Sequence, residues 1–229
     1  MNIVFVFLLI FISFRLYSKT KELFQQSGIQ FLSKEETEEF LSLDKDEYID
    51  KLRPMDLLNR NVETIEKYKE RIKNSGVDFN RVQKEKLNKS VQEAQERLLI
   101  KDSKYIENEL IVGMNWKIAL TDGSYELGLP HTRSDIIFLT SDVINRKDLV
   151  DVLIHEKVHL YQRKYKERFQ RVLKENGYTI VNKRKNRDDL RSNPDLDEFV
   201  YSKGGNIYDR NNGYYEHPNE EIAYMMEKK

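Results

Sequence analysis

The amino-acid sequence predicts an α+β fold, and three observations support this prediction. Helical patterns fill residues 33–100, whereas residues 116–140 are rich in the β-branched and aromatic residues that favour strands. A second helical pattern begins near residue 149 and carries two of the four histidines of the chain. We therefore expect a helical region, followed by several strands and then by a histidine-bearing helix.

Four helices are expected between residues 33 and 100. Ser33 followed by Glu36 is a capping-box pattern that starts the first, and Pro54 is expected to interrupt or end the second. The third is indicated by an apolar face of Val62, Ile65 and Ile72. The fourth should end near residue 100, and its apolar face consists of Leu87, Val91, Ala94 and Leu98. We expect these helices to pack on the rest of the chain, with a coiled-coil face for a partner as the alternative.

The strand-rich stretch contains a hairpin signal. The Asp122-Gly123 pair is typical of a tight hairpin turn, so residues 116–120 and 124–128 are expected to be its two arms. A further apolar run predicts a strand over residues 136–140.

A helix is expected to follow this strand. Asn145 suits the N-cap and Asp148 suits the first turn, and an apolar face then begins with Leu149, Val152 and Leu153. This helix would include residues 155–159. Beyond residue 172, turn residues and short apolar runs predict an irregular insertion with one or two strands.

The composition limits the classes of partner and chemistry. The chain has 39 basic and 39 acidic residues, which removes any general electrostatic reason to expect a nucleic-acid partner. It has no cysteine, which excludes disulfides, thiol nucleophiles and every cysteine-containing zinc site.

The N-terminal segment predicts attachment to a membrane. Residues 3–14 carry no charge, and the apolar character continues to Tyr17. A helix of this length spans about 25 Å, slightly less than the hydrocarbon layer of ~30 Å. Because the basic residues follow the apolar run, a single-pass anchor would leave the C-terminal part in the cytoplasm. A cleaved signal peptide and a secreted protein are the alternative, although no small-x-small cleavage site precedes Lys19.

The sequence from His155 to His159 reads H-E-x-x-H, which is typical of catalytic zinc helices. Residues four apart lie on one face of a helix, so the two imidazoles can reach one Zn²⁺ ion. Glu156 lies one residue round the helix, where it can act as a general base without binding the metal. Zinc chemistry of this kind activates water and polarises a carbonyl, and Glu156 would pass the proton to the leaving amine.

A catalytic zinc site needs a third protein ligand. The extended pattern HExxHxxGxxH is excluded, because Gln162 and Tyr165 stand where it requires glycine and histidine. Near the C-terminus, residues 219–223 read N-E-x-x-A, and Pro218 is well placed to begin a helix. The combination resembles the gluzincin branch of zincin metallopeptidases, in which a glutamate on a second helix is the third ligand. The resemblance implies Glu220 as this ligand, with Glu221 and His217 as open alternatives.

The resemblance also implies a zincin-like fold, with a β-sheet beside the HExxH helix. Its edge strand, expected here at Asp135 to Thr140, would bind extended peptide or protein substrate. The chain is also similar to uncharacterised zincin-like proteins of large DNA viruses. Gluzincins often carry an acidic residue four positions after the glutamate ligand, where this chain has Tyr224, so a different group is expected to orient an imidazole.

Other residues are candidates for roles near the metal. His217, with Tyr214 and Tyr215, could donate hydrogen bonds to an oxyanion. For His131 and Arg133, a turn that satisfies its own backbone is favoured over contact with substrate.

Together these observations predict three regions: a hydrophobic anchor or signal segment (1–17), a helical region (18–104) and a zincin-like metallopeptidase domain (105–229). The predicted function is zinc-dependent hydrolysis of peptide bonds, with Glu156 and His217 as catalytic residues and with His155, His159 and Glu220 as metal ligands. The alternative is an inactive zincin-fold binding module whose helical region contacts a partner. The sequence leaves the substrate and the oligomeric state open.

Overall fold

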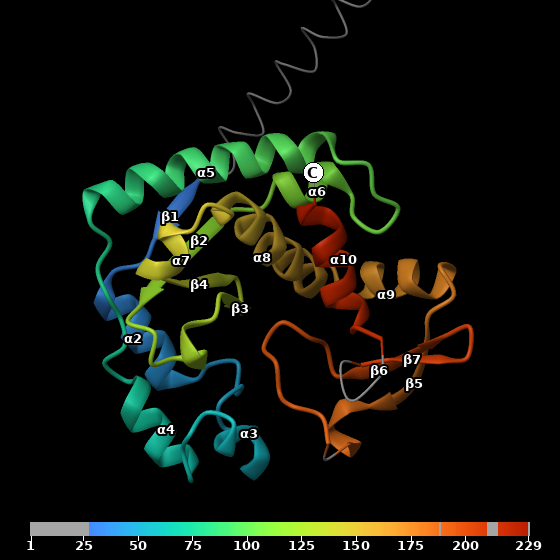
Figure 1. The fold of residues 1–229 in the computed structure, drawn as a ribbon, viewed down its shortest axis with the longest axis horizontal. Coiled ribbons are helices and arrows are strands. Elements are labelled where there is room, and N and C mark those ends of the chain that lie inside the picture. The colour runs from blue at the N-terminus through green and yellow to red at the C-terminus, as the bar shows by residue number, and fades with distance from the viewer. Residues whose placement is uncertain (1–27, 188, 210–214, 229) are drawn as a thin grey trace, which may run out of the picture.

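The structure, a computed structural model, describes residues 28–187, 189–209 and 215–228 (Figure 1). These residues form an α+β fold, which confirms the predicted class. The predicted membrane anchor at residues 1–17 lies outside the described residues. Within the described ranges, no helix is both long and apolar enough to cross a bilayer.

A four-stranded sheet forms the centre of the fold, in the order β1-β2-β4-β3. Its strands are β1 (Ile29–Phe31), β2 (Trp116–Thr121), β4 (Ile136–Thr140) and β3 (His131–Arg133). The first three are mutually parallel, and β3 runs antiparallel to β4 at one edge. The short strand β1 was not predicted, and it joins the N-terminal part of the chain to the same sheet as residues 116–140.

Both faces of this sheet are buried. Along β2, Ile118 and Leu120 belong to one apolar cluster, whereas Ala119 between them belongs to another. Helices α5 (Arg81–Ile100) and α8 (Leu149–Lys164) contribute to the first cluster, and α2 (Lys34–Leu43) and α4 (Ile65–Ile72) contribute to the second. In Figure 1, α5 lies across the top of the molecule and α2 and α4 lie at the lower left. The sheet is therefore the middle layer between two groups of helices.

The predicted hairpin of residues 116–120 and 124–128 is wrong. The first arm is β2, but both of its edges are occupied by the parallel strands β1 and β4. The Asp122 carboxylate accepts hydrogen bonds from the backbone N–H and the hydroxyl of Ser124, and a short 3₁₀ turn (Glu126–Gly128) follows. The real hairpin joins β3 to β4. The predicted strand over residues 136–140 is confirmed as β4, but its predicted edge position is wrong, because β4 lies inside the sheet and β3 is the edge strand on that side.

The local helix signals were mostly correct. The Ser33 and Glu36 capping box is present at the start of α2, and α5 ends at Ile100 as predicted. Pro54 begins the short helix α3 (Pro54–Leu58) instead of ending a helix, because its missing N–H is tolerated in the first turn. Two further short helices are α6 (Asn108–Val112) and α7 (Ser141–Asn145).

Helix α8 contains the HExxH residues, as predicted, but its start differs. Asn145 is the last residue of α7 rather than an N-cap. Asp148 directly precedes α8, and its side chain pairs with Arg146 instead of capping the helix. The helix is deeply buried against α5 and the sheet, which holds its histidines in fixed positions.

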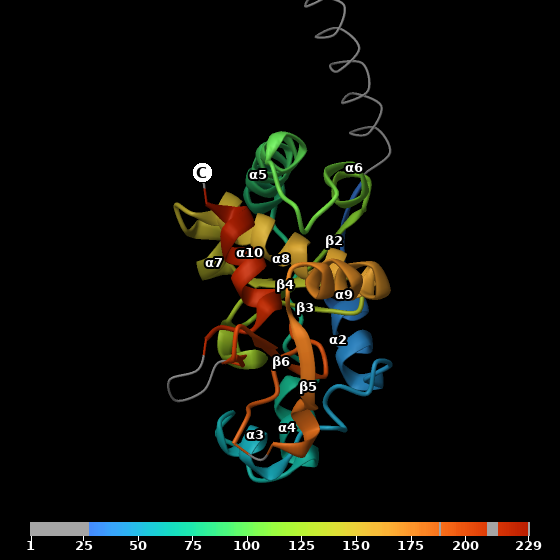
Figure 2. The ribbon, with the colours of Figure 1, turned by 90° about the vertical axis from the view of Figure 1, so that its right-hand side faces the viewer.

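The rest of the chain forms a second layer beside α8. Helix α9 (Lys166–Glu175) leads into an antiparallel sheet of β5 (Thr179–Lys183), β6 (Phe199–Lys203) and β7 (Asn206–Tyr208). The predicted insertion thus contains three strands rather than one or two. Helix α10 (Pro218–Glu227) begins at Pro218 as predicted. It returns to lie along α8, and Figures 1 and 2 show the two helices side by side.

Candidate metal centre

The packing of α10 on α8 brings together the three predicted metal ligands. His155 and His159 lie one turn apart on α8, and Glu220 lies in the first turn of α10. The Oε2 atom of Glu220 is 3.2 Å from Nε2 of His155 and 3.8 Å from Nε2 of His159. One ligand atom from each residue lies within 4.8 Å of the others, so the three side chains could hold a metal ion.

The start of α10 explains why Glu220 faces α8. His217 caps the helix by accepting a hydrogen bond from the Asn219 N–H, and Pro218 fixes the backbone of the first residue. Gln162 of α8 then donates to the Asn219 carbonyl at 3.0 Å, which ties the first turn of α10 to the helix that carries the histidines. The Glu220 side chain is thereby directed at the imidazole pair.

Each imidazole is oriented through its other nitrogen. Nδ1 of His155 lies 2.9 Å from Oε2 of Glu227, and Nδ1 of His159 lies 2.9 Å from Oε1 of Gln162. Such partners fix the ring and leave Nε2 of each histidine directed at the ligand position. The sequence prediction that a group other than residue 224 orients an imidazole is confirmed. Tyr224 instead packs its ring against the edge of His155, with centroids 4.8 Å apart.

The donor set could hold a metal ion. Two imidazole nitrogens and one carboxylate oxygen are a common ligand set for catalytic Zn²⁺, and they leave further coordination positions for water or substrate. The Nε2 atom of His159 is buried and has no hydrogen-bond partner in the described part of the chain. A buried nitrogen without a partner is costly, and a bound cation would satisfy it.

Burial and mutual charge shift the pKa values of the three ligands. Burial alone would lower the pKa of His155, but hydrogen bonds to Glu220 and Glu227 raise it to about 10. Burial alone would raise the pKa of Glu220, but the nearby His159 and His155 lower it to about 2. Burial lowers the pKa of His159, which favours the neutral imidazole that binds metals. Without a metal, a proton on His155 therefore pairs with the Glu220 carboxylate, and a divalent cation would replace that proton.

Glu156 lies beside these ligands and has an unused carboxylate oxygen. Its side chain is almost completely buried, and its Oε2 atom has no hydrogen-bond partner among the residues described. Burial raises its pKa well above the usual value, and the negative charges of Asp195 and Glu220 raise it further. A carboxyl group with a raised pKa is suited to accept and then release a proton.

His217 lies outside this cluster, and its position does not support the predicted oxyanion role. Its Nδ1 atom caps α10, and its Nε2 atom lies 3.1 Å from the Phe199 carbonyl. The ring is completely buried, so neither nitrogen is available to an oxyanion at the metal cluster. The other proposed third ligand, Glu221, points elsewhere and accepts a hydrogen bond from Tyr178 at 2.8 Å.

The remaining sequence candidates have structural roles or are not described. Tyr215 stacks on Tyr208 with ring centroids 5.0 Å apart, and Tyr214 lies outside the described residues. Arg133 is buried and forms an ion pair with Asp44 at 2.5 Å. His131 donates from Nδ1 to the Leu129 carbonyl at 2.9 Å, but His131 and Arg133 lie in strand β3, so the favoured turn is wrong at these two positions.

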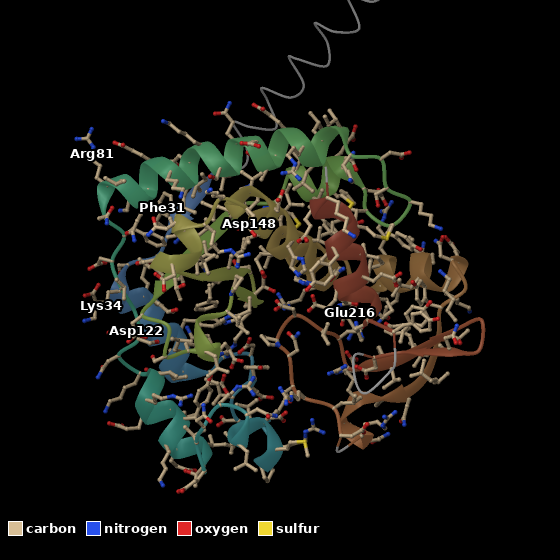
Figure 3. All side chains as sticks on the ribbon, viewed as in Figure 1. Phe31, Lys34, Arg81, Asp122, Asp148 and Glu216 are labelled. Carbon is tan, nitrogen blue, oxygen red and sulfur yellow. The ribbon has the colours of Figure 1, made fainter. Side chains whose placement is uncertain are left out.

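Glu220 forms part of the wall of a cleft of about 670 Å³, so this cleft reaches the metal cluster. Glu216, labelled in Figure 3 at the N-terminal end of α10, also lines it. A smaller cavity of about 200 Å³ reaches the cluster at His159. Asp195 and Leu196 line both spaces, so the segment that contains them separates the two cavities.

Four residues around the cluster were missed by the sequence interpretation: Gln162, Asn193, Asp195 and Glu227. Gln162 follows His159 by three residues, so helical spacing places these two side chains on one face of α8. Glu227 follows Glu220 by seven residues, which places these two side chains on one face of α10. This spacing was a usable signal. Asn193 and Asp195 lie in a loop within the insertion, where no local pattern indicates contact with the metal cluster.

Comparison of the chain with known protein families, with curated proteins and with solved structures finds no match. The chemistry of this site is therefore argued from its residues and their geometry.

Proposed function

We propose that this chain is a zinc-dependent metallopeptidase of gluzincin type that hydrolyses peptide bonds. The single observation that supports this most is the convergence of His155 and His159 with Glu220, although sixty residues separate His159 from Glu220 in the sequence. Glu156, with its unpaired carboxylate oxygen, completes the set of groups that such a reaction needs. The zincin-like fold is part of the same proposal.

Each residue has a defined role in this proposal. His155, His159 and Glu220 would hold the zinc ion, while Glu227 and Gln162 keep the two imidazoles in place. A zinc ion bound there supplies Lewis-acid chemistry, which activates water and polarises the peptide carbonyl. Glu156 takes the proton from the attacking water and delivers it to the leaving amine.

The test compares two substitutions in the full-length chain. Glu156→Gln should retain zinc and lose hydrolysis of a peptide library, because the ligands remain while the base is lost. His159→Ala should lose both zinc and hydrolysis. Elemental analysis and a fluorescence-quenched peptide library measure the two properties separately. Equal hydrolysis by Glu156→Gln and the wild type would exclude this mechanism.

A second candidate function is an inactive zincin fold that acts as a binding or scaffolding module. The observation that favours it is the deep burial of the cluster: the His159 side chain is 0% exposed, and that of Glu220 is 10% exposed. A closed site of this kind suits a structural metal that fastens α10 to α8. A zinc-loaded protein that cleaves no peptide in the library, and that binds a partner through residues 33–100, would support this alternative.

We further propose that residues 1–17 attach the chain to a membrane, with the metallopeptidase part on the cytoplasmic side. The support comes from the uncharged apolar run and from the basic residues that follow it. Deletion of residues 1–17 should move the protein from the membrane fraction to the soluble fraction. Recovery of the full-length chain with soluble proteins would contradict attachment.

A further inference from the structure

The segment Leu190–Leu196, here named the strap, lies directly over the candidate metal centre. It belongs to the orange loop that extends from the β5-β6 sheet towards β3 in Figure 1. The amide of Asn193 donates to Oε1 of Glu220 at 3.1 Å, so the strap touches a proposed metal ligand. The Asp195 carboxylate is buried, and Asp195 lines the same cavities as Glu220 and His159. The strap thus contacts the cluster from the side of the two cavities.

The strap also occupies the free edge of β3. Thr132 is the middle residue of this edge strand, and its backbone N–H donates to Oδ1 of Asp195 at 2.7 Å. Its hydroxyl donates to the same oxygen, also at 2.7 Å. Its carbonyl accepts a hydrogen bond from Arg163 at 3.3 Å. An extended peptide that adds to a sheet edge pairs with these backbone groups, so the chain itself now fills the position of such a peptide.

Several side chains hold the strap in this position, and they include Arg60, Arg184 and Asn219, which donate to the carbonyls of Ser192, Arg191 and Asp195. Two further fastenings lie on opposite sides of the strap. On the side of the cluster, Arg163 of α8 donates to the Pro194 carbonyl at 2.7 Å. On the other side, the Asp56 carboxylate of α3 accepts hydrogen bonds from the N–H and the hydroxyl of Ser192, at 2.7 and 2.8 Å. Arg53, which precedes α3, donates to the carbonyls of Arg187 and Leu190. The second fastening contains none of the proposed ligands or catalytic groups.

We propose that the strap is an autoinhibitory segment, which occupies the peptide-binding edge of β3 and is held closed by α3. This inference rests on the proposed peptidase function. The Asp195 carboxylate oxygen takes the place of the carbonyl oxygen that a substrate backbone would offer to the Thr132 N–H. A substrate can then bind only when the strap leaves β3. Weaker contacts between the strap and α3 make this release more frequent. The helical region therefore limits access to the metal centre.

The test loosens the fastening at α3, which is remote from the metal ligands. The double variant Arg53→Ala/Ser192→Ala removes the arginine contacts and the serine hydroxyl, and Ser192→Ala alone is a milder version in case the double variant does not fold. Loss of two or more hydrogen bonds should open the strap on the order of tenfold more often. The matched control is Arg81→Ala, which removes an arginine with its own ion pair to Glu85. Figure 3 shows Arg81 at the N-terminal end of α5.

Two measurements on the full-length chain, with zinc supplied, separate the possible outcomes. Amide hydrogen exchange in the fragment that contains Thr132 reports opening of the strap, and cleavage of a fluorescence-quenched peptide library reports access to the metal centre. Both rates should rise together in the variants and stay at the wild-type level in Arg81→Ala. Unchanged exchange at Thr132, or faster exchange without faster cleavage in a chain that does cleave, would overturn the inference. Faster exchange with no cleavage by any chain, including the wild type, would refute the peptidase function while leaving the release of the strap supported.

Discussion

Glu227 fixes the orientation of His155 from a position two helical turns beyond Glu220. A carboxylate on Nδ1 determines which nitrogen faces the metal and makes the imidazole a stronger donor. Glu227→Gln should therefore weaken zinc binding by about 10- to 100-fold, the usual effect of losing such a partner. Competition with a chromogenic chelator measures the affinity.

The matched control lies on the same helix. Glu221→Gln changes the neighbouring residue of Glu220, but that side chain binds Tyr178 and not a histidine. Its zinc affinity should equal that of the wild type. A large loss of zinc in Glu221→Gln, with none in Glu227→Gln, would contradict the assignment of Glu220 as a ligand and of Glu227 as the group that orients His155.

Asp56 makes stability depend on pH. Burial alone would raise the pKa of Asp56, but hydrogen bonds from Ser192 and Arg53 outweigh this and lower it. The folded state thus binds the proton less readily than the unfolded state, whose aspartates have a pKa of about 3.9. The resulting stabilisation is fully present above that value and is lost as the pH falls through the lower folded-state pKa.

Asp56→Asn should remove this dependence. Urea unfolding at pH 6 and at pH 3 should show a smaller fall in the free energy of unfolding for Asp56→Asn than for the wild type. The variant should already be less stable at pH 6, because an amide is a weaker acceptor for the four donors from Ser192 and Arg53. An equal fall in both proteins would show that Asp56 is not the group that titrates.

At the scale of elements, α5 depends on a complete capping box at its N-terminus. The Asn80 side chain accepts a hydrogen bond from the Gln83 N–H at 2.9 Å, and Oε1 of Gln83 accepts one from the Asn80 N–H, also at 2.9 Å. Asn80→Ala should lower the free energy of unfolding by about 1 kcal/mol, the typical effect of losing an N-cap. Asn88→Ala, at an exposed position inside the same helix, should be neutral or slightly stabilising because alanine favours helices. Urea unfolding of both variants measures the difference.

Elements whose signal is local were predictable from the sequence. Ser33 and Glu36 cap α2 through contacts within four residues, and the apolar spacing from residue 87 to 98 describes the buried face of α5. The spacing of H-E-x-x-H predicted that His155 and His159 share one helix face, whereas Glu220 was implied by the resemblance of N-E-x-x-A to gluzincins, and the structure brings the three together.

Elements that depend on distant partners were not predictable in this way. Asp122-Gly123 is a good hairpin signal, but β1 and β4 compete for the edges of β2 and leave no place for a second arm. Strand β1 has only three residues, so its pattern is too short to recognise. The role of Asp195 also depends on a distant partner. Its contact with Thr132 joins residues 63 positions apart, and nothing in the sequence near either residue indicates this contact.

At the scale of the whole molecule, the proposed metal centre links parts of the chain that the backbone leaves far apart. His155 and His159 belong to the helix that packs on the central sheet, whereas Glu220 belongs to the last helix of the chain. A zinc ion that binds only the folded state stabilises it by RT ln(1 + [Zn²⁺]/Kd), which is about 4.1 kcal/mol at 1,000 times Kd. The unfolding temperature should therefore rise with zinc concentration.

The zinc-dependent rise in unfolding temperature, compared between variants, distinguishes binding at the metal cluster from binding at a surface site. Glu156→Gln should show the same zinc-dependent rise in unfolding temperature as the wild type, because it keeps all three ligands. His159→Ala and Glu220→Ala should lose most of the rise, since two ligands bind zinc far less tightly than three. Thermal unfolding of the four proteins, with and without zinc, provides the measurement. A full zinc effect in Glu220→Ala would show that α10 contributes no ligand, and the convergence of α8 and α10 would then have no role in binding the metal.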